Sequence, residues 1–551
     1  MSLRSHWAPC GLAALLLLAP VAQAVEGTGE KQSIEELRNT VINLLKALVD
    51  KGMLTREQAE ILVKQAQDKA ATDAAAAAAK NAEQAKEDQN AVRVPYVPQI
   101  VKDEISKQVA AEVRPAVVAD VVKEAKSEKW GVPAALPEWL SRVRVFGDVT
   151  LREQSDLYPR DNSENLIPDY NTINQAGGFG RTAYPFLNTT QDRNRLRLRA
   201  RLGVEGDISP YLTAYIRLAS GSLTDPGSES QTLGNYGQRY TVGIDQAYLA
   251  WNSNTSDKLS LSTMQGGRIP NPWFAPTELV YARDLSFEGV AETLRFGWGS
   301  GDSDRSHVYA TLGAFPILEV PLVNQENKWL VGGQLGTNLR FNDGADHVRF
   351  AAAYYDFLHV TGQRNDFNSA LLNYTAPAFV RSGNTMFDIS NVAALDQTVN
   401  LFALAAHFRL VDIAANYEHN FAGYSVALSG EGVRNIAYNQ AEVEALSGQT
   451  FTSPQNKGYV GEVSFGRPIV DRFGAWRVAV GYRYVKGDAV LDAWTDADFH
   501  EGGTNAQGYY VWTSFGLAKN TWLRLRYLSA NEIDGPRYGL DILQLDVNAR
   551  F

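Results

Sequence analysis

The sequence predicts an all-β transmembrane barrel of sixteen antiparallel strands, connected up and down and preceded by a helical region. Three observations predict this class. In the second part of the chain apolar and polar residues alternate, most of the alternating segments are 10 to 14 residues long, and long and short connections follow one another in turn. A tilted membrane strand needs about 9 to 11 residues, whereas strands of globular sheets average about 5 to 6.

The composition excludes a helical membrane protein. The chain has 551 residues, of which 45% are hydrophobic, and a formal net charge of −10. After the amino terminus, no stretch approaches the roughly 18 to 20 consecutive apolar residues that a spanning helix needs. A membrane β-barrel is still allowed, because its strands have one apolar and one polar face and its average composition resembles that of a soluble protein.

Residues 1–24 have the pattern of a secretory signal peptide. Arg4 precedes an apolar run at 11–19, and a small-residue site ends at Ala24, so we expect export and cleavage there. The only cysteine, Cys10, lies within this segment. The mature chain therefore has no cysteine, which excludes disulfides, thiol catalysis and cysteine-rich metal sites, and we expect neither a metal nor a cofactor.

Residues 25–130 have the periodicity of helices. Ser33 and Glu36 form a capping box, and an apolar stripe follows at intervals of three and four residues. A stripe this narrow cannot bury itself in a monomer, which leaves two alternatives: a coiled coil that associates with other copies, or a semi-rigid spacer. Pro133 and Pro137 mark a linker at 131–140, so that the barrel occupies 141–551.

Beyond the linker, turn residues divide the chain into sixteen alternating segments. They are 142–152, 193–206, 210–220, 240–252, 257–269, 285–298, 305–315, 328–341, 345–358, 398–409, 411–420, 457–467, 474–486, 505–516, 519–530 and 540–551. Long connections follow the odd-numbered segments and short ones the even-numbered segments, including a junction at Leu410. Eight long loops at one end and seven short turns at the other are typical of an outer-membrane barrel with both ends on the short-turn side.

The two faces of these segments differ as a membrane requires. In the last segment Leu543, Leu545 and Val547 share one face, and Gln544 and Asp546 share the other. Only the first of these faces can meet lipid. Four tryptophans, Trp251, Trp298, Trp476 and Trp522, come next to short turns, where an aromatic girdle is expected.

The strongest chemical signal is a row of arginines in the second segment. Arg195, Arg197, Arg199 and Arg201 alternate with apolar residues, so all four share one face. In hydrocarbon each would cost roughly 2 to 4 kcal/mol near the midplane, and we therefore place them in the lumen. The same register adds further inward arginines on this wall: Arg142, Arg144, Arg152, Arg217, Arg524, Arg526 and Arg550.

This arginine wall has two readings, which do not exclude each other. It can attract anions into the pore, because selectivity follows the local field rather than the net charge. Alternatively, the arginines pair with carboxylates and hold the wall and an inner loop rigid.

Several segments resemble the family of putative porins of Gram-negative bacteria. They are 145–152, 193–220, 267–273 with 284–289, and the amino-terminal hairpin at 33–66. The resemblance implies an outer-membrane diffusion channel, often a homotrimer, with no assigned substrate. It also suggests an assembly role for Phe551. A weaker resemblance is to phosphate-selective porins, although their lysine-rich arrangement is not evident.

The resemblance also suggests a constriction loop. The third long loop would fold into the pore and oppose its carboxylates to the basic wall. Its candidate residues are Arg268, Asn271, Trp273, Glu278 and Asp284.

Rival functions have less support. The six histidines of the mature chain are scattered, and there is neither a Gly-x-Ser-x-Gly elbow nor a His-Glu-x-x-His pair, so we do not expect an enzyme. We expect an outer-membrane porin for small hydrophilic solutes, with a preference for anions, embedded in outer-membrane lipid and without a nucleic-acid partner. The alternative is a structural protein whose region 25–130 lies in the periplasm and tethers the membrane to peptidoglycan.

Overall fold

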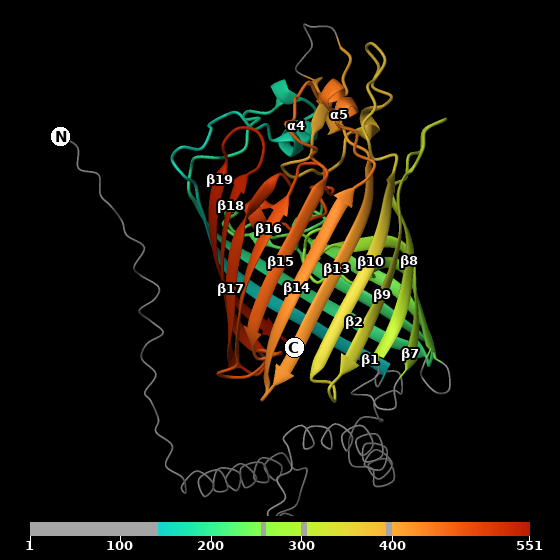
Figure 1. Ribbon diagram of the computed structural model, residues 1–551. Coiled ribbons are helices and arrows are strands. Elements are labelled where there is room, and N and C mark those ends of the chain that lie inside the picture. Colours follow the sequence, from blue (N-terminus) through green and yellow to red (C-terminus); the bar gives the residue numbers. More distant parts are fainter. Residues whose placement is uncertain (1–141, 255–259, 299–305, 393–398) are drawn as a thin grey trace, which may run out of the picture. The chain divides into compact units, whose positions relative to one another are not determined.

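Sixteen strands form one closed antiparallel barrel in the computed structural model, which describes residues 142–254, 260–298, 306–392 and 399–551 (Figure 1). β1 pairs with β2 on one side and with β19, the last strand, on the other. Closure leaves no open sheet edge, as a lipid environment requires. The predicted signal peptide, helical region and linker lie outside the described residues.

The barrel strands have the following bounds: β1 Val143–Leu157, β2 Arg193–Ser209, β3 Leu212–Ser220, β5 Val242–Asn254, β6 Ser260–Pro270, β7 Ser286–Trp298, β8 Ser306–Leu318, β9 Lys328–Phe341, β10 Asp346–Leu358, β13 Phe408–Phe421, β14 Tyr424–Asn435, β15 Lys457–Gly466, β16 Trp476–Val485, β17 Ala506–Ala518, β18 Thr521–Glu532 and β19 Gly539–Arg550.

Shorter elements lie in the connections. β4 (Gln231–Thr232) extends the sheet beside β2, and β11 (Met386–Asp388) pairs with β12 (Phe402–Leu404). Two short helices, α4 (Tyr170–Ala176) and α5 (Gln440–Ser447), lie in loops. Within the described ranges, no helix is long and apolar enough to cross a membrane.

The predicted number of strands is confirmed, and the expected strand 411–420 lies within β13, but most of 398–409 is not a barrel strand and β14 was not expected. The expected strands 398–409 and 411–420 do not meet at a turn, because β13 runs straight through Leu410. The turn is at Ala422 and Gly423, whose φ angles of 49° and 77° suit a two-residue hairpin, and β14 follows in a segment that we expected to be a loop. Phe402–Leu404 belongs instead to the small loop sheet.

With this correction the connections still alternate between the two ends of the barrel. One end carries the connections that begin after β1, β3, β6, β8, β10, β14, β16 and β18. At the other end the described connections are 210–211, 342–345, 422–423, 467–475 and 519–520. The length rule is not strict, since 467–475 is longer than 533–538. The elements α4 and α5 lie at the long-loop end (Figure 1).

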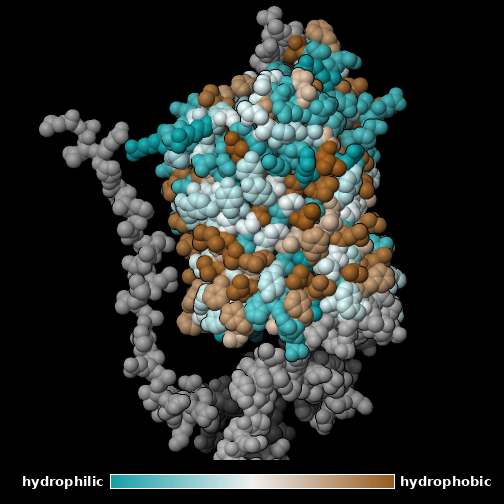
Figure 2. Space-filling view, viewed as in Figure 1, coloured by the Kyte–Doolittle hydropathy of each residue, from teal (hydrophilic) through white to brown (hydrophobic). Residues whose placement is uncertain are grey.

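Side chains alternate between an apolar outer face and a polar inner face. In β19 the exposed fractions of Leu543, Leu545 and Val547 are 42%, 43% and 41%, whereas Gln544 and Asp546 are buried. In Figure 2, hydrophobic residues gather over the strands and hydrophilic residues over the long loops. The outer face is therefore suited to lipid.

Three of the four tryptophans lie on the outer face, near short turns: Trp251, Trp298 and Trp476. The fourth is a correction. Trp522 shares its face of β18 with Arg524, and the guanidinium of Arg550 lies 5.9 Å from its ring centre. Its even-numbered position places it on the inner face, so it does not belong to a girdle.

The seam of the barrel depends on a glycine. The backbone of Gly147 exchanges two hydrogen bonds with Phe551 (3.2 and 3.0 Å), and the phenyl ring lies over the glycine. A Cβ atom at residue 147 would come 2.5 Å from the backbone oxygen of Arg201 and 2.6 Å from that ring. A side chain at 147 therefore requires the two strands or the ring to shift.

We expect Gly147→Val to lower the free energy of unfolding by about 1 to 3 kcal/mol, because overpacking forces the seam apart. Urea unfolding in phospholipid vesicles, followed by tryptophan fluorescence, measures this change. Gly206→Val is the matched control, since nothing lies within 4 Å of a Cβ atom there. Equal stability of the two variants would contradict the prediction.

Candidate functional site

The loop 271–285, between β6 and β7, crosses the lumen. It contacts strands far from its own place in the barrel. The backbone of Phe274 exchanges hydrogen bonds with the side chain of Gln334 on β9, Thr277 donates to Glu431 on β14, and the carbonyl of Glu278 accepts from Arg483 on β16. A loop that contacts this wall, and also contacts β2 through Asp284, must lie inside the barrel.

An aromatic cluster around Trp273 packs this loop against the barrel wall. Trp273 is 4% exposed and stacks on Tyr281, with ring centres 5.5 Å apart, while Tyr355 meets it edge-on at 4.8 Å. Gly332 leaves space for this packing, since a Cβ atom there would lie 3.0 Å from the indole. Trp273 therefore belongs to the inserted loop and holds it against the wall.

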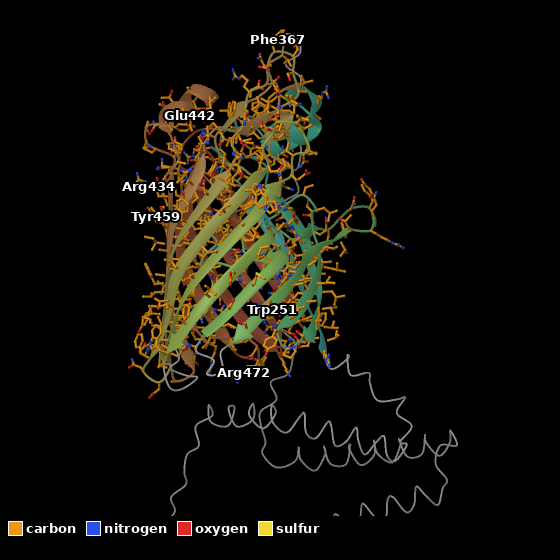
Figure 3. All side chains as sticks on the ribbon, turned by 90° about the vertical axis from the view of Figure 1, so that its right-hand side faces the viewer. Trp251, Phe367, Arg434, Glu442, Tyr459 and Arg472 are labelled. Carbon is orange, nitrogen blue, oxygen red and sulfur yellow. The ribbon has the colours of Figure 1, made fainter. Side chains whose placement is uncertain are left out.

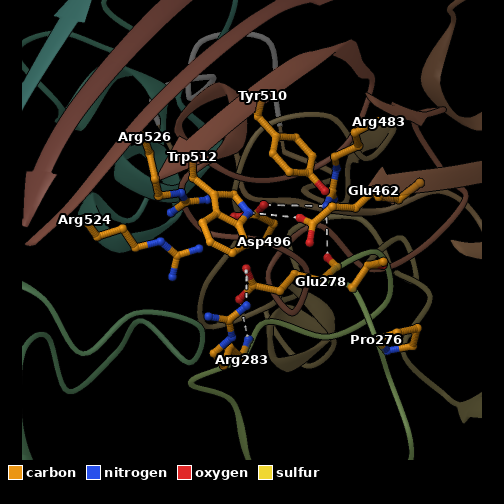
Figure 4. Close-up of a pocket in the computed structure, with 12 residues that line it drawn as sticks. Pro276, Glu278, Arg283, Glu462, Arg483, Asp496, Tyr510, Trp512, Arg524 and Arg526 are labelled. Carbon is orange, nitrogen blue, oxygen red and sulfur yellow. Dashed lines mark hydrogen bonds and ion pairs between the residues drawn. The ribbon is translucent and has the colours of Figure 1, made fainter. Parts of the chain in front are cut away.

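Between the loop and the wall lies a narrow opening of about 90 Å³ (Figure 4). Its lining includes Glu278 and Arg283 of the loop and, from strands β15, β17 and β18, Glu462, Tyr510, Trp512, Arg524 and Arg526. In Figure 4 the guanidinium groups of Arg524 and Arg526 lie on one side, Glu462 and Arg483 lie on the other, and the carboxylates of Glu278 and Asp496 lie between them.

Most arginines of the predicted wall face inward and are paired with carboxylates. The pairs, with nitrogen to oxygen distances where given, are Arg195 with Asp156 and Glu501 (3.4 Å), Arg199 with Asp284 (3.3 Å) and Asp148 (3.4 Å), Arg201 with Asp148 (2.7 Å), Glu229 (3.1 Å) and Asp284 (3.4 Å), Arg217 with Asp245 and Glu229 (3.2 Å), Arg152 with Asp546 (2.7 Å) and Asp498 (2.9 Å), and Arg526 with Asp498 (2.6 Å). These contacts favour the reading in which the arginines fix the wall and the loops.

Four of these eight carboxylates lie on strands, and the other four come from three loops, two of which the sequence pattern does not indicate. Asp284 belongs to the predicted loop, but Glu229 comes from 221–241, and Asp498 and Glu501 come from 486–505. Burial alone would raise the pKa of Asp498, but Arg152 holds it, together with Arg526, well below its ordinary value. Asp498 is therefore ionised and joins β1 to β18 across the seam strand β19.

Glu229 differs from Asp498 in its protonation. Burial, followed by the neighbouring carboxylates of Asp284 and Asp245, raises the pKa of Glu229 above its ordinary value, although Arg201 and Arg217 oppose the shift. On acidification this group takes up a proton at a higher pH than an ordinary glutamate. Its two arginines then lose part of their neutralisation, and the lumen becomes more positive.

Two half-buried arginines of the predicted wall, Arg197 and Arg524, have no carboxylate within 4 Å among the described residues. The guanidinium of Arg197 contacts the side chains of Gln154 (3.2 Å) and Ser228 (3.5 Å), whereas that of Arg524 lies 4.6 Å from the ring centre of Trp512. The Nε atom of each is buried without a hydrogen-bond partner. These two groups keep an attraction for anions that the paired arginines have lost.

Arg197 and Arg524 belong to one cross-strand row on the inner face. Arg197 lies opposite Arg152, Arg152 opposite Asp546, and Asp546 opposite Arg524. This row of four strands carries three arginines and one aspartate, and its excess of positive charge is offset in part by Asp498 of the loop 486–505.

The remaining predicted site residues are less central. Arg550 faces inward over Trp522, and Arg144 pairs with Glu205 but is largely exposed. Arg142 is exposed and precedes β1. Asn271 accepts a hydrogen bond from the backbone of Trp273 and shapes the start of the loop.

Arg268 is a correction, because it lies on the outer face of the barrel. Its Nη1 atom lies 2.7 Å from the carboxylate of Glu288, its cross-strand partner on β7. The next residue, Ile269, is fully buried inside, so alternation directs Arg268 outward. It is not part of the constriction.

Sequence reasoning missed one inward arginine on the opposite wall. Arg349 of β10 lies 5.8 Å from the ring centre of Phe274 and donates to His347 (3.2 Å). Alternation in segment 345–358 gives the signal, since the neighbours Phe350 and Ala352 are exposed and residue 351 is buried.

Comparison with known proteins decides the family. Residues 38–551 match the model of a family described as "Putative porin". The chain belongs to this family. It is an outer-membrane porin, and both family and fold are those of a channel rather than an enzyme. No curated protein matches the sequence.

Three solved structures illustrate what this porin is similar to. OprB of Pseudomonas putida at high pH has 11% identity and a TM-score of 0.43, over 77% of this chain and 97% of that one. DcaP of Acinetobacter baumannii has 11% identity and a TM-score of 0.37, over 74% and 97%. OmpF of Salmonella typhi in complex with daunomycin has 12% identity and a TM-score of 0.38, over 74% and 97%.

We expect Gln334→Leu to loosen the loop of this porin, because the N–H and C=O of Phe274 lose their partners at about 1 to 3 kcal/mol each. Single-channel recording in planar bilayers is then expected to show a larger and noisier conductance. Thr311→Val is the control, because Thr311 bonds to Thr293 of a neighbouring strand and not to the loop. Indistinguishable traces for wild type and Gln334→Leu would contradict the anchoring role.

Proposed function

We propose that this porin allows passive diffusion of small hydrophilic solutes across the outer membrane with a preference for anions. The observation that carries the preference is the pair Arg197 and Arg524, which have no carboxylate partner among the described residues. Arg197 lines a space of about 280 Å³, and Arg524 lines the narrow opening between the inserted loop and the wall. The net charge of the whole chain opposes this preference, but pore selectivity follows the local field.

The paired arginines contribute less to the preference. A guanidinium bound to one or two carboxylates has little remaining field at a distance, so Arg199 and Arg201 act mainly as anchors for Asp284. The arginine wall thus has two roles. Most of its arginines anchor loops, and those without a carboxylate attract anions.

Reversal potentials in planar bilayers under a salt gradient test the preference. We expect wild type to pass chloride more readily than potassium, and Arg197→Gln with Arg524→Gln to lower this permeability ratio about threefold, since two uncompensated charges leave the pore. Arg268→Gln is the matched control, because that arginine lies on the outer face. A cation-selective wild type, or an unchanged ratio in the double variant, would refute the anion preference.

We further expect a homotrimer, and the outer wall supports it. Glu153 of β1 is exposed on the outer face, opposite Leu196 and Leu545. A carboxylate among apolar residues is costly in lipid, whereas a second copy could cover it. The solved structure of OmpT of Vibrio cholerae is described as a trimer form.

The tether to peptidoglycan through residues 25–130, in the periplasm, is the alternative role and is compatible with a channel. It is supported only by the apolar stripe in the sequence. Deleting 25–130 tests both points: we expect the deletion variant to remain trimeric in mild detergent and to conduct as wild type does, but to lose attachment of the envelope. An unchanged envelope would exclude the tether, and a monomeric variant would show that the helical region makes the trimer.

A further inference from the structure

Two cations face each other on the outside of the barrel. Arg434 of β14 and Lys457 of β15 are direct cross-strand partners, and both side chains are exposed. They share the outer face with Leu428 and Tyr459. Like charges directly opposite each other destabilise a strand pair, and an anion bound between them relieves this repulsion.

The protein supplies no such anion in the part of the chain that the structure describes. Neither Arg434 nor Lys457 forms an ion pair or a side-chain hydrogen bond there, while two acids of the same region are already paired. The carboxylate of Asp356 accepts from Arg409 at 3.1 Å, and that of Glu442 lies 3.5 Å from the imidazole of His407. The two cations are left for a partner from outside the chain.

Their height on the barrel indicates what kind of partner this is. Tyr459 follows Lys457 on the same face of β15, and its ring stacks on Tyr484 and Tyr482, with centres 5.1 and 6.5 Å apart. Figure 3 shows Arg434 just beyond Tyr459 toward the long loops, at the edge of the barrel. Tyrosines in such a belt mark the membrane interface, so the two cations lie at the level of the lipid headgroups.

We propose that Arg434 and Lys457 bind the phosphate group of a phosphorylated lipid in the outer leaflet. Arginine can hold two phosphate oxygens at once, and lysine adds a point charge from the neighbouring strand. The acyl chains of the same lipid would lie along the apolar surface below, which includes Tyr459 and the exposed Val463 and Val480. A free phosphate ion lacks this second contact. The site lies outside the pore and does not depend on the proposed selectivity.

The test compares three probes on the full-length porin in mild detergent. They are a diphosphorylated lipid A, the same lipid without its phosphates, and inorganic phosphate, each measured by native mass spectrometry or by titration. We expect wild type to bind the phosphorylated lipid at least about tenfold more tightly than the dephosphorylated one, and we expect inorganic phosphate to bind weakly. Arg434→Gln with Lys457→Gln is expected to remove the tenfold difference.

Arg472→Gln is the matched control. Arg472 is also exposed, but it lies in the turn 467–475 at the opposite end of the barrel (Figure 3). Unchanged conductance of the double variant shows that the barrel is intact. Equal binding of both lipids by wild type, or an undiminished difference in the double variant, would overturn the proposal. Tight binding of inorganic phosphate alone would also overturn it, in favour of a free-anion site.

Discussion

The structure depends on one constraint: a guanidinium group is too costly to leave in hydrocarbon. The four arginines of β2 follow one another on a single face, and only the lumen can accept them. Because a shift of one residue would turn all four toward lipid, they fix the register of the strand. Inside, three of them pair with carboxylates, some from the neighbouring strand β1 and some from loops at the long-loop end.

The form of the pore follows from these ion pairs. Asp284 joins the inserted loop to Arg199 and Arg201, and Asp498 joins a second loop to Arg152 and Arg526. Removing one partner of a buried ion pair costs about 3 to 5 kcal/mol, so each loop is held firmly at its charged contact. The narrow opening lies between segments that these ion pairs hold in place. Its shape therefore does not require a loop whose backbone is rigid by itself.

Sequence alternation predicted the barrel, its strand number and the inward arginines. This was possible because each strand has only two faces, and the face that meets lipid must be apolar. It failed at β13 and β14. Residues 402–406 are apolar on both faces because they pack between a loop and the barrel, which imitates a strand, and the turn at Ala422 and Gly423 lacks the polar residues that usually mark turns. Long-range partners such as Asp498 could not be predicted, since no local pattern shows which loop enters the lumen.

The strands and the loops have different roles in this pore. The strands hold the arginines in fixed positions, and separate loops bring carboxylates to them. The strands keep the same arginine positions whatever the loops contain, and each of these loops offers one or two acidic residues to those arginines. The same arginines can therefore bind loops of different sequence, provided that each loop has an aspartate or glutamate where it reaches the arginines. Channels of different bore and charge can arise by exchange of loops alone, without any change in the register that the membrane imposes.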